Sequence, residues 1–158
     1  NSEDFIGAKV LLSQDNKTKS LEVLKKIIKQ NDEVYSPLSL FLIIDRDLEA
    51  DKKDVIKYFD QVLSIKSLEK EDRNLLKLKK AIYLSEDAEE NDLLNLLNPI
   101  LNSNSVWKYQ SLKFIGDYYF DKKEYNKAKQ YYSDILMLDN TNNDIKDINR
   151  KIKIINNG

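Results

Sequence analysis

The chain has 158 residues, of which 41% are hydrophobic and 34% charged, and its 26 basic and 27 acidic side chains leave a formal net charge of −1. This size is enough for one folded domain, whereas the near-neutral charge provides no field that would gather nucleic acid or anionic lipid. The lack of cysteine and histidine excludes disulfides, thiol chemistry, Cys/His zinc sites and histidine-based triads. With only two prolines and three glycines, the composition predicts helices rather than β-hairpins.

Apolar side chains at helical spacing predict two helical hairpins in the first part of the chain. The first hairpin is expected at about residues 3–30 and the second at about residues 35–64. Pro37 fits the first turn of a helix that runs to about residue 49. Because this helix is apolar on most sides, we expect it to be buried.

Two further hairpins and a final helix are expected in the second part of the chain. The third hairpin spans about residues 68–102, and Pro99 predicts a kink or an early end of its second helix. Ser105 fits the N-cap of the fourth hairpin, at about residues 106–138. An isoleucine-rich capping helix is expected at about residues 143–155. The pattern therefore predicts four hairpins and one capping helix.

Gly116 lies in the middle of the first helix of the fourth hairpin. A glycine there costs about 1 kcal/mol relative to alanine, so it requires a reason in the packing. The expected reason is a close approach to Ala128 on the next helix, with Tyr119 and Tyr132 filling the space on either side. The fourth hairpin is thus predicted to be tightly packed.

A period recurs along the chain, which indicates a repeat architecture. The mid-helix positions of the four hairpins are separated by steps of 35, 38 and 35 residues, in the first and in the second helices alike. These positions are Ala8, Ile43, Ala81 and Gly116 in the first helices, and Ser20, Val55, Leu93 and Ala128 in the second helices. Ile43 and Leu93 replace small residues, so we expect wider or shifted packing in the second and third hairpins.

The fourth hairpin resembles the tetratricopeptide repeat. The residues that carry this resemblance are Leu112, Ile115, Gly116, Tyr119, Ala128, Tyr132 and Ile135. The chain departs from the repeat pattern at Leu112, where tryptophan is common, and at Asn140, where proline is usual. The resemblance implies an all-α, right-handed α-solenoid of tetratricopeptide-like hairpins in a single domain over residues 1–158, acting as a non-catalytic protein-interaction scaffold.

A resemblance over nearly the whole chain implies a cellular setting. The chain resembles bacterial YfgM-type proteins, which are ancillary subunits of the SecYEG translocon. The features that carry this resemblance are three weak hairpins, a short loop, Val106-Trp107-Lys108 at the start of a well-formed repeat, and the isoleucine-rich last helix. In that family one N-terminal transmembrane helix precedes a periplasmic domain, and the chain begins with Asn1 rather than Met, so we expect this to be such a domain at the bacterial inner membrane. The partners implied are Sec translocon or periplasmic chaperone components. A cytoplasmic repeat adaptor is the alternative.

The first helices of such hairpins line a concave face, which is the expected partner-binding surface. Its residues by the repeat register are Phe5, Lys9, Leu12, Leu40, Ile44, Leu75, Leu78, Ile82, Lys113, Asp117 and Phe120. This face is apolar enough to hold a hydrophobic or partly unfolded peptide. Two alternatives stay open: the groove closes into core under the last helix, or the face is buried in a homodimer.

No catalytic, cofactor or metal site is predicted. The basic clusters around residues 77–80 and 122–129 are expected to be solvated helix faces rather than a nucleic-acid track. The acidic run at residues 86–92 lacks the ligand spacing and the glycine of a calcium loop. A carboxylate-based hydrolase or a helical metal-binding domain is the alternative from a different class. Tyr118, Tyr125 and Tyr131 are expected near the surface, where tyrosine is favoured in interfaces.

Overall fold

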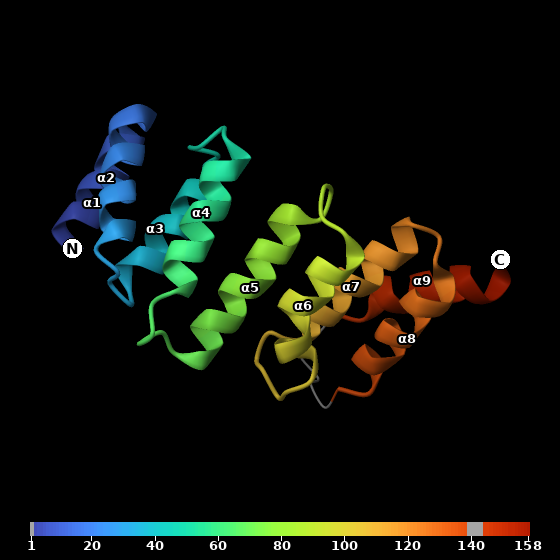
Figure 1. The fold of residues 1–158 in the computed structure, drawn as a ribbon. Coiled ribbons are helices and arrows are strands. Elements are labelled where there is room, and N and C mark those ends of the chain that lie inside the picture. The colour runs from blue at the N-terminus through green and yellow to red at the C-terminus, as the bar shows by residue number, and fades with distance from the viewer. Residues whose placement is uncertain (1, 139–143) are drawn as a thin grey trace. The chain divides into compact units, whose positions relative to one another are not determined.

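The computed structural model describes residues 2–138 and 144–158, and all of the regular secondary structure in these ranges is helical (Figure 1). The nine helices of the described ranges are α1 (Ser2–Ser13), α2 (Lys17–Lys29), α3 (Tyr35–Asp45), α4 (Lys52–Leu63), α5 (Lys70–Leu84), α6 (Glu90–Leu101), α7 (Lys108–Asp121), α8 (Tyr125–Leu136) and α9 (Lys146–Asn157). The all-α expectation is confirmed. The chain divides into two compact units, residues 1–76 and 77–158, and the assignment of a single domain stays a prediction.

Helix boundaries differ from the expected ones at three places. The helix that contains Pro37 ends at Asp45 instead of residue 49, because the backbone at Asp47 turns left-handed. α7 begins at Lys108, since the Ser105 hydroxyl accepts a hydrogen bond from the backbone N–H of Trp107 at 3.1 Å and holds a turn ahead of the helix. α6 passes through Pro99 and ends after Leu101. The expected start of the last helix at residue 143 lies outside the described residues.

Left-handed residues close the turns after four of the helices. Asp15, Asn31, Asp47 and Lys123 have φ of 59°, 56°, 51° and 62°. After Lys123 the backbone N–H of Glu124 donates to the Tyr119 carbonyl at 2.9 Å, and the N–H of Lys123 donates to the Phe120 carbonyl at 2.9 Å. This is the Schellman pattern, which satisfies the last carbonyls of a helix while the chain reverses. Local backbone chemistry therefore sets the hairpin turn between α7 and α8.

In the first unit, small polar side chains hold neighbouring helices close together. Ser20 on α2 is fully buried, and its hydroxyl donates to the Ala8 carbonyl on α1 at 2.9 Å. Ser36 on α3 donates in the same way to the Ile27 carbonyl on α2 at 2.9 Å. The apolar core of this unit is formed around Leu24, Leu40, Ile43, Phe59 and other buried side chains of the same helices.

In the second unit, the core is built around the contact between Gly116 on α7 and the ring of Tyr132 on α8. A Cβ atom at position 116 would lie 2.6 Å from Cε1 and 2.8 Å from Cδ1 of Tyr132. Ala128 and Tyr119 are also fully or almost fully buried beside this contact. The glycine is therefore required by the Tyr132 ring, a more specific reason than a close approach of Ala128.

The helix pairs of the hairpins differ in how far their backbones approach each other. All eight of these positions are buried. The backbones of α1 and α2, and of α7 and α8, approach closely along much of their length, whereas those of α3 and α4 do so far less and those of α5 and α6 hardly at all. The bulky residues Ile43 and Leu93 of these two hairpins are buried. The wider or shifted packing expected in these two hairpins stays a prediction.

Among the described residues, no helix is both long enough and apolar enough to cross a bilayer.

Gly7 and Gly116 both lie within helices, and substitution of each by alanine is expected to change the stability of the protein in opposite directions. Gly116→Ala forces a methyl group into the Tyr132 ring, so we expect the free energy of unfolding to fall by about 1–3 kcal/mol. Gly7 lies in α1 with nothing within 4 Å of its added Cβ, so Gly7→Ala is expected to raise the free energy of unfolding by about 0.5–1 kcal/mol. Urea unfolding measures both, and equal effects would contradict the packing argument.

The turn at Lys123 allows a second matched test. Lys123→Gly relieves a left-handed backbone that disfavours side chains, and is expected to raise the free energy of unfolding by about 0.5–1 kcal/mol. Lys122 has a right-handed backbone with φ of −80°, so Lys122→Gly is expected to lower it by a similar amount. Thermal or urea unfolding of the two variants distinguishes backbone relief from the loss of a positive charge, which both share.

Candidate protein-binding surface

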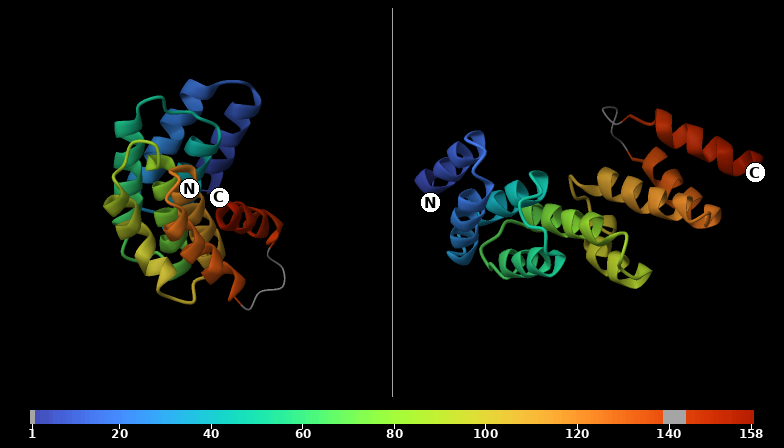
Figure 2. Two further views of the ribbon diagram at one scale, coloured as in Figure 1. Left: turned by 90° about the vertical axis from the view of Figure 1, so that its right-hand side faces the viewer. Right: turned by 90° about the horizontal axis from the view of Figure 1, so that it is seen from above.

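The last helix packs against the α7 part of the predicted concave face. Ile148 of α9 is fully buried in the core of the second unit, and Ile152 and Ile155 pack against the same core. Figure 2 shows α9 running beside α7 and α8. The ammonium of Lys151 on α9 lies 5.4 Å from the centroid of the Phe120 ring on α7. Phe120 is therefore a half-buried intramolecular contact.

Four charged side chains join α7 to α9 beneath the hydroxyl of Tyr132. The Lys113 ammonium lies 2.9 Å from the Asp117 carboxylate and 3.3 Å from that of Asp147. The Lys151 ammonium lies 2.8 Å from Asp117 and 3.2 Å from Asp147. The Tyr132 hydroxyl donates to Asp117 at 2.6 Å. Lys113 and Asp117, both predicted to face a partner, instead bind the chain's own last helix.

The pKa values of the two carboxyl groups reflect this network. Burial by itself would raise the pKa of Asp117, but hydrogen bonds from Lys151, Tyr132 and Lys113 outweigh it and hold that pKa below its usual value. The hydrogen bond from Arg150, followed by those from Lys151 and Lys113, lowers the pKa of Asp147 strongly. Both groups therefore stay ionised in the folded protein to unusually low pH.

The remaining predicted residues do not share one environment. Leu40 and Leu78 are buried in the cores of their units. Lys9 and Ile82 are exposed, and the half-buried residues are Phe5, Leu12, Ile44 and Leu75. Phe5 packs against Tyr35, with ring centroids 5.8 Å apart. The predicted set thus divides into core residues, contacts of α9 and scattered surface positions.

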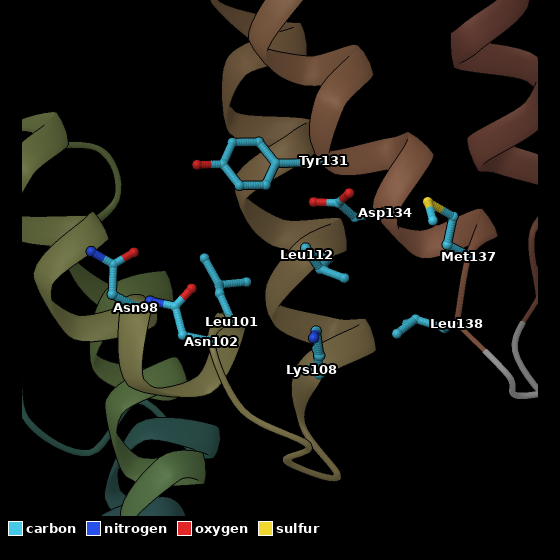
Figure 3. Close-up of a pocket in the computed structure, with 9 residues that line it drawn as sticks. All are labelled: Asn98, Leu101, Asn102, Lys108, Leu112, Tyr131, Asp134, Met137 and Leu138. Carbon is cyan, nitrogen blue, oxygen red and sulfur yellow. The ribbon is translucent and has the colours of Figure 1, made fainter.

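The second unit contains a cleft that the repeat register did not predict. It has a volume of about 390 Å³ and lies where the C-terminal ends of α6 and α8 meet the N-terminal end of α7. Figure 3 shows the α6 side chains on one side, the α8 side chains on the other and Leu112 between them. Its lining residues are Asn98, Leu101, Asn102, Lys108, Leu112, Tyr131, Asp134, Met137 and Leu138. Leucine side chains form an apolar base of the cleft, and polar side chains surround this base as a rim.

Three of the polar rim residues, Asn98, Asn102 and Asp134, are exposed, and Lys108 is half-buried. In the described part of the chain, none of the side chains of Asn98, Asn102, Lys108 and Asp134 makes a hydrogen bond or an ion pair within the protein. Tyr131 is held differently: its ring stacks on Tyr119 with centroids 5.7 Å apart and planes 5° apart. One wall is therefore fixed by packing, while the polar groups stay available.

Apolar side chains at the cleft and nearby stand unusually exposed to solvent. Met137, which forms part of the cleft, is 83% exposed, and Val106, in the loop that precedes α7, is 69% exposed. Large exposed apolar side chains beside a polar rim are characteristic of protein-interaction sites. Sequence reasoning missed this surface because it combines the ends of the second helices α6 and α8 with the start of α7, a first helix. Its one signal was Tyr131, expected near the surface.

Carboxylates elsewhere serve as hydrogen-bond acceptors. Tyr119 donates to Glu90, which also lies 3.0 Å from Lys127, and Tyr58 donates to Glu49 at 2.8 Å. These contacts lower the pKa of Glu90 and of Glu49, whereas a carboxyl group that acts as a general acid near neutral pH needs a raised pKa. Among the described residues, no three Asp or Glu side chains gather in a group that could hold a metal ion.

The α7–α9 network predicts a dependence of stability on pH. A lowered folded-state pKa stabilises the protein above the unfolded-state pKa of about 4, and this stabilisation is lost as pH falls through the folded-state value. We therefore expect Asp117→Asn to lower the free energy of unfolding by about 1–2 kcal/mol at pH 7, and by less at pH 3. Asp121→Asn removes an exposed carboxylate that forms no ion pair among the described residues, and should change the free energy of unfolding little. Urea unfolding at both pH values tests this, and an equal loss at each would contradict it.

Comparison with known proteins identifies no relative. No protein-family model, curated protein or solved structure matches the chain.

Proposed function

We propose that this protein is a non-catalytic protein-interaction scaffold built from tetratricopeptide-like hairpins in a right-handed α-solenoid. Burial of all eight repeat positions supports the repeat register. The tight packing at Gly116 and Tyr132, and the close Ala8–Ser20 contact, support the tetratricopeptide-like character of the fourth and first hairpins. Repeat folds of this kind present rigid surfaces to other proteins.

The cleft between α6 and α8 is the proposed partner-binding site. The observation that carries this proposal is the combination of three features in one 390 Å³ cleft: an apolar base, the 83% exposed Met137, and a rim of polar side chains that make no hydrogen bond or ion pair with the residues that the structure describes. A partner would bury apolar area there at about 25 cal/mol per Å², and would satisfy the rim groups. Affinity then comes from packing and hydrogen bonds, and no bond in the partner is broken.

The proposed cellular setting rests on the resemblance to YfgM-type proteins. It assigns this chain to the periplasmic side of a bacterial inner membrane, tethered by a helix outside the present sequence, with Sec translocon or periplasmic chaperone components as partners. A cytoplasmic adaptor is the alternative. Self-association is a second candidate, favoured by the apolar residues Ile6 and Val10 of α1, which are 60% and 48% exposed.

Photocrosslinking from the cleft in living cells tests these proposals. With the full-length protein carrying a photoreactive residue at Met137, we expect covalent adducts with membrane or periplasmic proteins. The same residue at Lys153, which is exposed on α9, should give few of them. Adducts with only cytosolic proteins would overturn the proposed location, and adducts with a second copy of the chain would replace the scaffold by a homodimer. The absence of any Met137-specific adduct would overturn binding at the cleft.

A further inference from the structure

The cleft described above has features that specify the conformation of what it binds. Asn98 and Asn102 stand four residues apart at the C-terminal end of α6, and both line the cleft (Figure 3). Residues at this spacing lie on the same side of a helix, about 5–6 Å apart. A carboxamide has two N–H donors and an acceptor oxygen. The α6 wall thus offers two donor–acceptor groups in a row.

An extended peptide matches this row, because its exposed peptide groups on one edge recur every two residues, about 6.6 Å apart. A helical peptide does not match it, since the N–H and C=O groups in its interior are already paired with each other. Binding a helix would leave both carboxamides desolvated without partners, which costs about 1–3 kcal/mol for each group. The carboxamides of Asn98 and Asn102 therefore favour binding of a peptide in an extended conformation.

The rest of the cleft specifies the side chains of that peptide. Leu101, Leu112 and Leu138 form an apolar base, which suits one apolar side chain. The Lys108 ammonium and the Asp134 carboxylate lie on α7 and α8 respectively, and within the described residues neither has a charged partner. Charge complementarity places an acidic group of the occupant near Lys108 and a basic group near Asp134.

We propose that the cleft recognises an extended peptide segment, with Asn98 and Asn102 hydrogen-bonded to its main chain, an apolar side chain on the leucine base and oppositely charged flanking residues at Lys108 and Asp134. The inference deepens the proposed protein-binding function and rests on it. Tyr131, held by its stack on Tyr119, forms a fixed wall opposite the two carboxamides.

Selection from a phage-displayed library of random peptides, with the whole purified chain as bait, tests the proposal. We expect enriched peptides that have an apolar residue between an acidic and a basic one. Replacement of their amides by esters, one at a time, should weaken binding at alternating positions. Enrichment of amphipathic helical peptides that tolerate every ester would overturn the extended mode. The absence of any enriched peptide would overturn recognition of a linear segment, while in-cell adducts at Met137 would still support the protein-binding function.

Matched variants on α6 isolate the contribution of the two carboxamides. Asn98→Ala/Asn102→Ala is expected to weaken binding of a selected peptide about tenfold or more, as the loss of two hydrogen bonds implies. Asn91→Ala/Asn95→Ala makes the same change at the same spacing on exposed positions of α6 outside the cleft, and should leave the affinity unchanged. Calorimetry measures both, with circular dichroism to verify folding. Equal affinities of the two double variants would overturn the role of Asn98 and Asn102.

The same peptide selection also tests the role of the charged residue Lys108 at the rim of the cleft. With Lys108→Glu as bait, the acidic residue should disappear from the enriched peptides and a basic one should take its place, while the apolar residue stays. Asp121→Lys changes the charge on an exposed position of α7 outside the cleft and should leave the enriched pattern as it is. An unchanged pattern with Lys108→Glu would overturn the assignment of the acidic position.

Discussion

The ring of Tyr132 occupies the space that any side chain at position 116 would need, and the second unit is arranged around this contact. Burial of the ring brings α7 and α8 into close approach. The same ring carries a hydroxyl that donates to Asp117, and Asp117 in turn binds Lys151 of α9. One apolar contact therefore determines both the spacing of a helix pair and the position of the carboxylate that holds the next helix.

The contact also determines which side chains of α8 face the cleft. Successive residues on a helix point about 100° apart, so fixing Tyr132 toward α7 fixes the direction of Tyr131 as well. Tyr131 then stacks on Tyr119 and forms one wall of the cleft. The cleft is accordingly preformed by the core of the unit, and a ligand that enters it does not have to order that wall, which reduces the entropy cost of binding.

The sequence was sufficient to predict the all-helical structure and the approximate positions of the helices, because helical periodicity is a local property. Gly116 indicated a tight pair, and the close contact with the Tyr132 ring bears this out. The surface was far less predictable. Lys113 and Asp117 look like solvent-facing residues of a helix. Nothing nearby in the sequence reveals their partners Asp147 and Lys151, each 34 residues further along the chain. The cleft likewise combines three helices, and no single periodicity encodes such a combination.

The exposed methionine of the cleft has a chemical consequence of its own. The sequence contains one methionine and no cysteine, so Met137 carries its only sulfur atom, and that side chain is 83% exposed. Oxidants convert methionine to a sulfoxide, which replaces an apolar side chain with a polar one. Every reaction of peroxide with sulfur in these 158 residues therefore takes place at one wall of the cleft, and makes that wall more polar.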